Sequence, residues 1–190
     1  MTVTTGPVMG EPLPIELANA TYAVRGHLQD GLQTDEQLAF WLEQVRSRLA
    51  LPLPDPIAIG LSDLATARDI RDTIRTLATA AITGTPPEAA AVEVLNRHVR
   101  SAPRWRELRW DHEPSVQPLS EAPAVPAALS AIAQDAVDLF TGPDLAKLRA
   151  CQAPGCVLFF VKDHHRREWC SAACGNRARA ARHYDHVRNQ

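Results

Sequence analysis

Four cysteines are the residues of this 190-residue chain best suited to chemistry, and all of them lie in its last 40 residues. Their spacing is Cys151-x4-Cys156-x13-Cys170-x3-Cys174, which makes two close pairs separated by a loop. Paired cysteines at this separation are typical of tetrahedral sites in which four thiolates bind Zn²⁺. The spacing therefore predicts a zinc site with these four ligands.

The four cysteines allow other interpretations. The four could be free or buried thiols without a metal, although a cluster in a reducing cytoplasm favours a metal site. His164 or His165 could replace one cysteine, but two complete pairs leave both histidines as expected residues of a solvated turn. A catalytic zinc needs an open coordination position, whereas four thiolates fill the shell. We therefore expect a structural zinc.

The residues around the cysteines predict the elements that hold them. Pro154-Gly155 supplies a turn between the first pair, residues 157–161 have the composition of a β-strand, and residues 162–167 form a second turn. Ser171 can cap a helix that places Cys174 in its first turn. The expected unit is a zinc ribbon-like hairpin followed by a helix.

The preceding chain predicts a mainly helical body with a small β-hairpin, an α+β fold. We expect a loose arm over residues 1–12, a body over 13–149 and the zinc module over 150–190. No flexible linker precedes Cys151, so we expect the module to pack on the body. A short strand or helix is expected over 13–19. Helices are expected to begin at the capping box 34–37, at Ser62 (ending at Gly84), at a second capping box 85–88 and at Pro123 (ending near Gly142). A hairpin is expected within 105–119.

Composition and charge narrow the class of protein. The chain is 45% hydrophobic and 22% charged, has no apolar run of membrane-spanning length and begins without a secretory signal, so we expect a cytoplasmic protein. Two lysines among 20 basic residues, with 15 prolines, suit a GC-rich bacterial genome. Residues 151–190 carry seven basic and three acidic residues, whereas residues 1–150 carry 13 and 19. An acidic body thus precedes a basic tail.

A helical projection of residues 171–188 separates two faces. The face expected to pack inward holds Ala173, Ala180, Tyr184 and Val187. The opposite face carries Arg179, Arg182 and His186, a stripe able to contact phosphates or enter a major groove. Arg166 and Arg167 in the preceding turn could add contacts to the DNA backbone. A solvated helix face without a ligand is the other interpretation, and the pI of about 6.4 is low for a DNA-binding protein.

The run from Trp169 to Tyr184 resembles the CGNR zinc-finger family, named after the tetrapeptide that is Cys174-Gly175-Asn176-Arg177 here. Residues 151–156 and 158–160 are similar to the first half of that finger. Such fingers close chains that begin with an ABATE domain, and residues 16–19 and 95–96 resemble signature positions of that domain. The resemblance implies a stress-responsive transcription regulator whose finger binds DNA. Within the motif we expect Gly175 to allow close approach to the metal loop, Asn176 to hydrogen-bond locally and Arg177 to hydrogen-bond carbonyls or the acidic body.

Two functions follow as hypotheses. The first is a regulator that binds DNA through the finger and its basic helix. The alternative is a module in which the zinc is structural or docks a protein partner. A homodimer is a further candidate assembly, because it would double the DNA contacts. A small-molecule effector could bind between the helices of the body, with Trp41, Trp105 and Trp110 as candidate walls, although core packing explains these tryptophans equally well. No enzyme is expected, because His27, His98 and His112 belong to no nucleophile, phosphate or metal motif.

Overall fold

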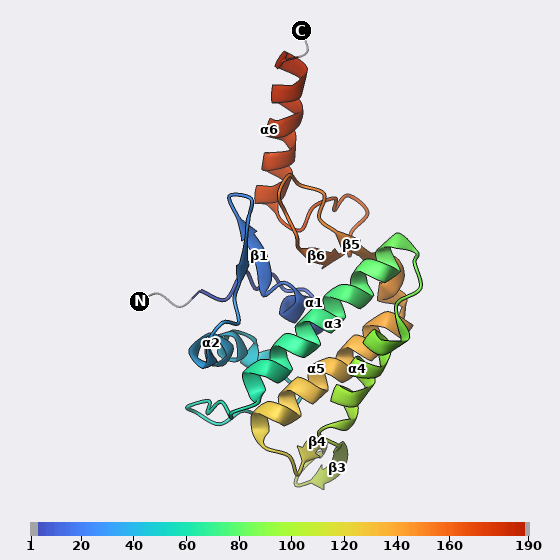
Figure 1. Ribbon diagram of the computed structural model, residues 1–190. Coiled ribbons are helices and arrows are strands. Elements are labelled where there is room, and N and C mark those ends of the chain that lie inside the picture. Colours follow the sequence, from blue (N-terminus) through green and yellow to red (C-terminus); the bar gives the residue numbers. More distant parts are fainter. Residues whose placement is uncertain (1–3, 189–190) are drawn as a thin grey trace.

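The structure, a computed structural model, describes residues 4–188 apart from the side chain of Asp185. Three helices, α3 (Asp63–Thr83), α4 (Ala89–Arg100) and α5 (Ala124–Thr141), form a central bundle (Figure 1). Helix α1 (Leu13–Ala18) packs on α3 and α5, and α2 (Asp35–Val45) packs on α3. Two 3₁₀ helices, η1 (Arg46–Arg48) and η2 (Pro143–Lys147), and the C-terminal helix α6 (Ala172–Arg188) complete the helices. The strands form three separate antiparallel pairs: β1 (Thr21–Val24) with β2 (His27–Asp30), β3 (Arg104–Trp110) with β4 (Pro114–Ser120), and β5 (Leu148–Ala150) with β6 (Phe159–Val161). The mainly helical α+β class is confirmed.

Helical spacing of apolar residues builds the core. Ile70, Ile74 and Leu77 recur along one face of α3 and are buried against Leu129 and Ile132 of α5 and against α1. The same cluster contains Leu148, Phe159 and Val161 of the β5–β6 hairpin. The zinc module therefore packs on the body, as the absence of a linker predicted.

The first twelve residues differ from the loose arm that the sequence predicted. Residues 1–3 lie outside the described part, and residues 4–12 contain no helix or strand. Thr5 and Glu11 are nevertheless buried. Backbone amides of Met9 and Glu11 donate to the buried carboxylate of Glu16, with N···O distances of 2.7–3.0 Å. These bonds fix the segment against α1.

One predicted capping box is confirmed, and two other predicted caps are wrong. Thr34 and Gln37 form the reciprocal capping box of α2. Ser62 is the N-cap residue of α3, but its side chain makes no capping bond, and Asp63 instead accepts from the Gly60 amide at 2.8 Å. Helix α4 begins after Glu88 rather than at Thr85, because consecutive prolines keep the residues before them extended.

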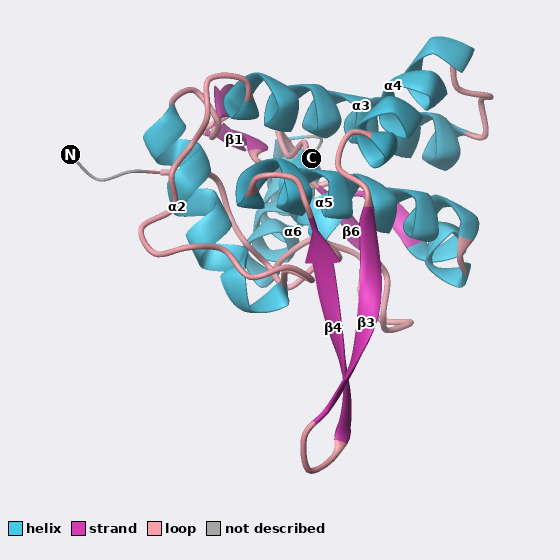
Figure 2. Ribbon diagram, turned by 90° about the horizontal axis from the view of Figure 1, so that it is seen from below, coloured by secondary structure: helices cyan, strands magenta, loops and turns pink. Residues whose placement is uncertain are grey.

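The predicted hairpin is confirmed and projects from the body as a two-stranded arm (Figure 2). Trp105 and Trp110 lie on its exposed strand β3, and Trp110 is 70% exposed. Trp41 lies instead in the helical core. The three tryptophans therefore do not form one pocket. Within the described residues, no helix is long and apolar enough to cross a membrane.

Candidate metal centre

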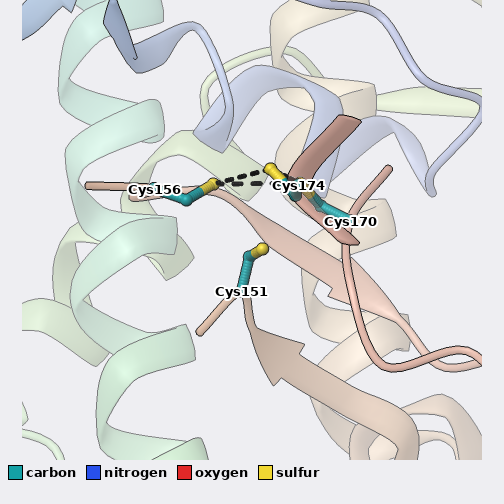
Figure 3. A group of neighbouring side chains, drawn as sticks. All are labelled: Cys151, Cys156, Cys170 and Cys174. Atoms are coloured by element: carbon teal, nitrogen blue, oxygen red, sulfur yellow. Dashed lines mark hydrogen bonds between the residues drawn. The ribbon is translucent and has the colours of Figure 1, made fainter. Parts of the chain in front are cut away.

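The first cysteine pair is held by the turn that joins β5 to β6. The Cys151 amide donates to the Leu158 carbonyl, and the Cys156 amide donates to the Ala153 carbonyl, each at 2.9 Å. Gly155 has a φ of 69°, which favours glycine because a side chain would be strained there. The turn thus brings both sulfur atoms to the same side of the hairpin (Figure 3).

The second pair lies at the start of α6. Ser171 Oγ accepts the Cys174 amide at 3.3 Å, and the Ser171 carbonyl accepts the Gly175 amide at 3.1 Å. Ser171 therefore caps the helix as predicted, and Cys174 occupies its first turn. Cys170 lies in the bend just before α6, with its sulfur 3.4 Å from that of Cys174, and both sulfur atoms face the first pair.

The four sulfur atoms lie within 4.8 Å of one another, and among the described residues no other such group of histidine, cysteine or acidic side chains occurs. Sγ···Sγ distances are 3.4 Å for Cys170–Cys174, 3.7 Å for Cys156–Cys174 and 3.8 Å for Cys156–Cys170. A tetrahedral zinc with bonds of about 2.3 Å requires sulfur atoms about 3.8 Å apart. The cluster therefore fits a Zn²⁺ ion bound by all four thiolates.

The thiols perturb one another's ionisation. Hydrogen bonds from Cys156 and Cys170 hold the pKa of Cys151 well below its usual range. The bond to Cys151 raises the pKa of Cys156 to about 11, and the pKa of Cys170 is also raised, chiefly by its bond to Cys151. Neighbouring thiols thus favour one thiolate at the expense of the others. A bound dication would favour the thiolate form of each ligand, and such a site supplies folding free energy rather than catalysis.

Three residues after Cys170 have the local roles that the motif predicted, with one difference of partner. A Cβ on Gly175 would lie 3.0 Å from Cδ1 of Trp169, so glycine permits the close approach of α6 to the metal loop. Asn176 Oδ1 accepts from Arg179. Arg177 Nη2 lies 3.1 Å from Cys174 Sγ rather than on a carbonyl or the body. Its positive charge would offset part of the net −2 of a Cys₄ zinc site.

The first of three joints between the zinc module and the body is made by an asparagine. Asn19, fully buried after α1, donates from Nδ2 to the Phe159 carbonyl at 2.9 Å and accepts the Phe159 amide on Oδ1 at 2.9 Å. Its carboxamide thus completes the outer edge of β6 as a neighbouring strand would. The chain separation of 140 residues makes this a purely tertiary contact.

Glu11 provides a second joint. Its Oε2 accepts the Val161 amide at 2.8 Å, and its Oε1 pairs with Arg167. Burial raises the pKa of Glu11 despite this partner. Arg167 also donates to the Val161 carbonyl and lies over the Phe160 ring. The structure therefore places Arg167 between module and body, whereas the sequence hypothesis gave it a DNA contact.

Arg75 of α3 is the third joint. Its guanidinium donates to the Ala18 carbonyl at 2.8 Å and the Val157 carbonyl at 3.2 Å, and it lies 5.1 Å from the centre of the Phe159 ring. Sequence reasoning missed Glu11 and Arg75, because no local pattern marks either. Asn19 did stand among the residues that resemble the N-terminal family.

Helix α6 extends away from the body beyond the zinc module (Figure 1). The prediction that Ala173, Ala180, Tyr184 and Val187 pack inward is wrong, since all four are exposed, Tyr184 by 73% and Val187 by 58%. Cys174, Gly175 and Ala178 are the positions buried instead, because only the first two turns contact the module. Arg179, Arg182 and His186 are exposed, as are Arg166 and the neighbouring His164 and His165.

A helical domain that carries a C-terminal four-cysteine finger defines the class of this protein. The chain belongs to the ABATE family, whose model, described as "Putative stress-induced transcription regulator", matches residues 11–143. The model of the CGNR zinc finger matches residues 147–186. A search of curated proteins found no match. The resemblance inferred from the sequence is confirmed for both parts.

Proposed function

We propose that this protein is a DNA-binding transcription regulator whose helix α6 contacts DNA. The observation that carries the proposal is the position of α6, which stands clear of the body with its arginines exposed. A helix of 17 residues is about 26 Å long and about 10–12 Å wide with side chains. The major groove, about 12 Å wide, admits a helix of this width.

Charge supports the same orientation. Helix α6 carries four arginines and one acidic residue, whereas the first 150 residues carry 19 acidic and 13 basic ones. The phosphate backbone therefore attracts the helix and repels the body, so an approaching DNA duplex meets the end of the molecule that carries α6.

Within this proposal, Arg179 and Arg182 lie three positions apart and His186 four further, which places them along one side of α6. Arg166, exposed in the turn before Cys170, adds a phosphate contact. Arg167 is assigned to docking because its guanidinium is paired with Glu11. The zinc has a structural role, holding the start of α6 against the β5–β6 hairpin.

The test is a titration of zinc-loaded protein with fragments of its own upstream DNA at about 50 and 200 mM salt. The double substitution Arg179→Ala with Arg182→Ala should weaken binding at least about tenfold and reduce the salt dependence by one to two ion equivalents. Its zinc content should not change. The matched control is Arg106→Ala with Arg109→Ala, two exposed arginines on the β3–β4 arm at the opposite end. Equal weakening by both pairs would refute a contact localised to α6.

A protein-docking role for α6 is the second candidate, and the exposure of Tyr184 and Val187 favours it. If no DNA fragment binds at low salt while zinc is present, this candidate replaces the first. The substitutions Tyr184→Ser and Val187→Ser would then abolish capture of a partner that Arg179→Ala with Arg182→Ala leaves bound.

A further inference from the structure

An apolar cavity opens between the three helices of the bundle, away from the zinc site. Its volume is about 550 Å³, within the range of about 300–1,000 Å³ of small-molecule sites. Helix α3, the loop after it, α4, α5 and η2 supply the walls. The principal lining side chains are Leu77, Ala81, Leu95, Val137, Phe140 and Leu145.

The chemistry of the lining selects the ligand. Among the residues that the structure describes, no charged one lines the cavity, so a charged molecule would lose hydration without gaining a partner. Val92 and Leu145 are lining residues that remain exposed, and burying them would be favourable. The lining therefore suits an uncharged, mainly apolar molecule.

One polar side chain in the lining is left without a partner. The carboxamide of Asn96 makes no hydrogen bond to any described residue, whereas the hydroxyls of the lining residues Thr85 and Thr141 are both bonded. An amide can both donate and accept, so it can pair with a hydroxyl or carbonyl group of a ligand.

We propose that this cavity is a binding site for an uncharged, mainly apolar small molecule with a hydroxyl or carbonyl group that Asn96 recognises. The apolar walls supply affinity, and the carboxamide selects among ligands of similar shape. This proposal is independent of DNA binding, because none of its residues lies in the finger.

The walls of the cavity continue into the joint with the finger. Leu77 follows Arg75 by two residues on α3, and Arg75 donates to the Val157 carbonyl of the finger. Leu145 lies in η2, from which the chain runs through β5 directly to Cys151. A ligand that moves α3 or η2 therefore changes how the finger is seated. This regulatory part rests on the proposed DNA-binding function.

The binding test uses the zinc-loaded full chain and the neutral fluorescent probe N-phenyl-1-naphthylamine. The wild type should bind one probe per chain with saturable fluorescence enhancement. Ala81→Trp, which fills the cavity, should weaken binding at least tenfold, whereas Thr79→Trp, exposed on α3 outside the lining, should leave it unchanged. Absence of saturable binding, or equal binding by the Ala81→Trp variant, would overturn the site. A dimer that Ala81→Trp dissociates would overturn it in favour of a second copy of the chain.

The role of Asn96 is tested with two competitors of the same shape. Displacement of the probe should show that 1-naphthol binds more tightly than naphthalene, and Asn96→Ala should reduce that preference about three- to tenfold, the value of one hydrogen bond. An unchanged preference would overturn recognition by Asn96.

The regulatory part is tested by DNA binding in the presence of the probe. A saturating concentration of the probe should change the affinity of the protein for DNA at least about fivefold. Unchanged DNA affinity would overturn the regulatory part while the binding result stands, and failure of DNA binding would leave the binding result intact.

Discussion

Replacing Asn19 with alanine tests whether one side chain fixes the zinc finger to the body. The substitution removes both partners of Phe159, whose amide and carbonyl each lie 2.9 Å from the asparagine in a buried position. Each backbone group left unsatisfied costs about 1–3 kcal/mol, so the expected loss for two groups is about 2–6 kcal/mol. That is a large share of a typical stability of about 5–15 kcal/mol.

The assay is urea unfolding of zinc-saturated protein, followed by tryptophan fluorescence and circular dichroism. Hydrogen exchange at the Phe159 amide gives a local measurement, and a loss of 2 kcal/mol corresponds to exchange about 30-fold faster. The control is Asn96→Ala, the same substitution where the side chain has no hydrogen-bond partner among the described residues, and it should change stability by under about 0.5 kcal/mol. A loss below 1 kcal/mol for Asn19→Ala would refute the docking role.

Three further predictions follow from the contacts above. Arg177→Gln removes the guanidinium that lies 3.1 Å from Cys174 Sγ and should lower zinc affinity about 10- to 100-fold, measured in competition with a chelating dye. The control Arg182→Gln should leave zinc affinity unchanged. Equal effects of the two substitutions would contradict a local role of Arg177. Burial raises the folded-state pKa of Glu11 above 4.5, so its carboxylate binds more protons folded than unfolded, and the stability that it contributes is lost as pH rises through that pKa. The stability of wild type relative to Glu11→Gln should therefore decrease from pH 5 to 7.5 in urea titrations at saturating zinc, and a constant or growing difference would count against the burial effect. Thr34→Ala should lower the free energy of unfolding by about 1 kcal/mol because it breaks the capping box of α2. Ser62→Ala should lower it by under about 0.5 kcal/mol, because the Ser62 side chain makes no capping bond. Comparable losses of stability in thermal unfolding would show that the two caps do not differ.

Elements defined by short-range bonds were predictable. The capping box of α2 and the capping serine before Cys174 each depend on residues within a few positions of one another, and the hairpin within 105–119 pairs two strands joined by a short turn. One helix start was misplaced for an equally local reason, because consecutive prolines delay α4. The start of α3 was predicted correctly, but Asp63 rather than Ser62 makes the side-chain bond there. Such errors change a boundary or a cap without changing the fold.

The candidate metal site was also readable from the chain, because the sequence spacing of the four cysteines limits how far apart their sulfur atoms can lie. The contacts around the site were harder to predict from the sequence. Arg167 is basic and close to the finger's turn, which suggested a phosphate contact, but its partner Glu11 is 156 residues away. No local pattern in the chain connects these two residues.

The main helices, the β3–β4 hairpin, the clustering of the cysteines and the separation of a basic tail from an acidic body follow from the sequence alone, since these depend on composition and on bonds between near neighbours. The departure of α6 from the body after two turns, with Tyr184 and Val187 exposed, follows instead from tertiary packing. A helical projection shows which residues share a face, but whether that face is covered depends on what packs there. The contacts of Glu11, Asn19 and Arg75 with β6 and the residues around it orient the finger and so leave the last turns of α6 uncovered.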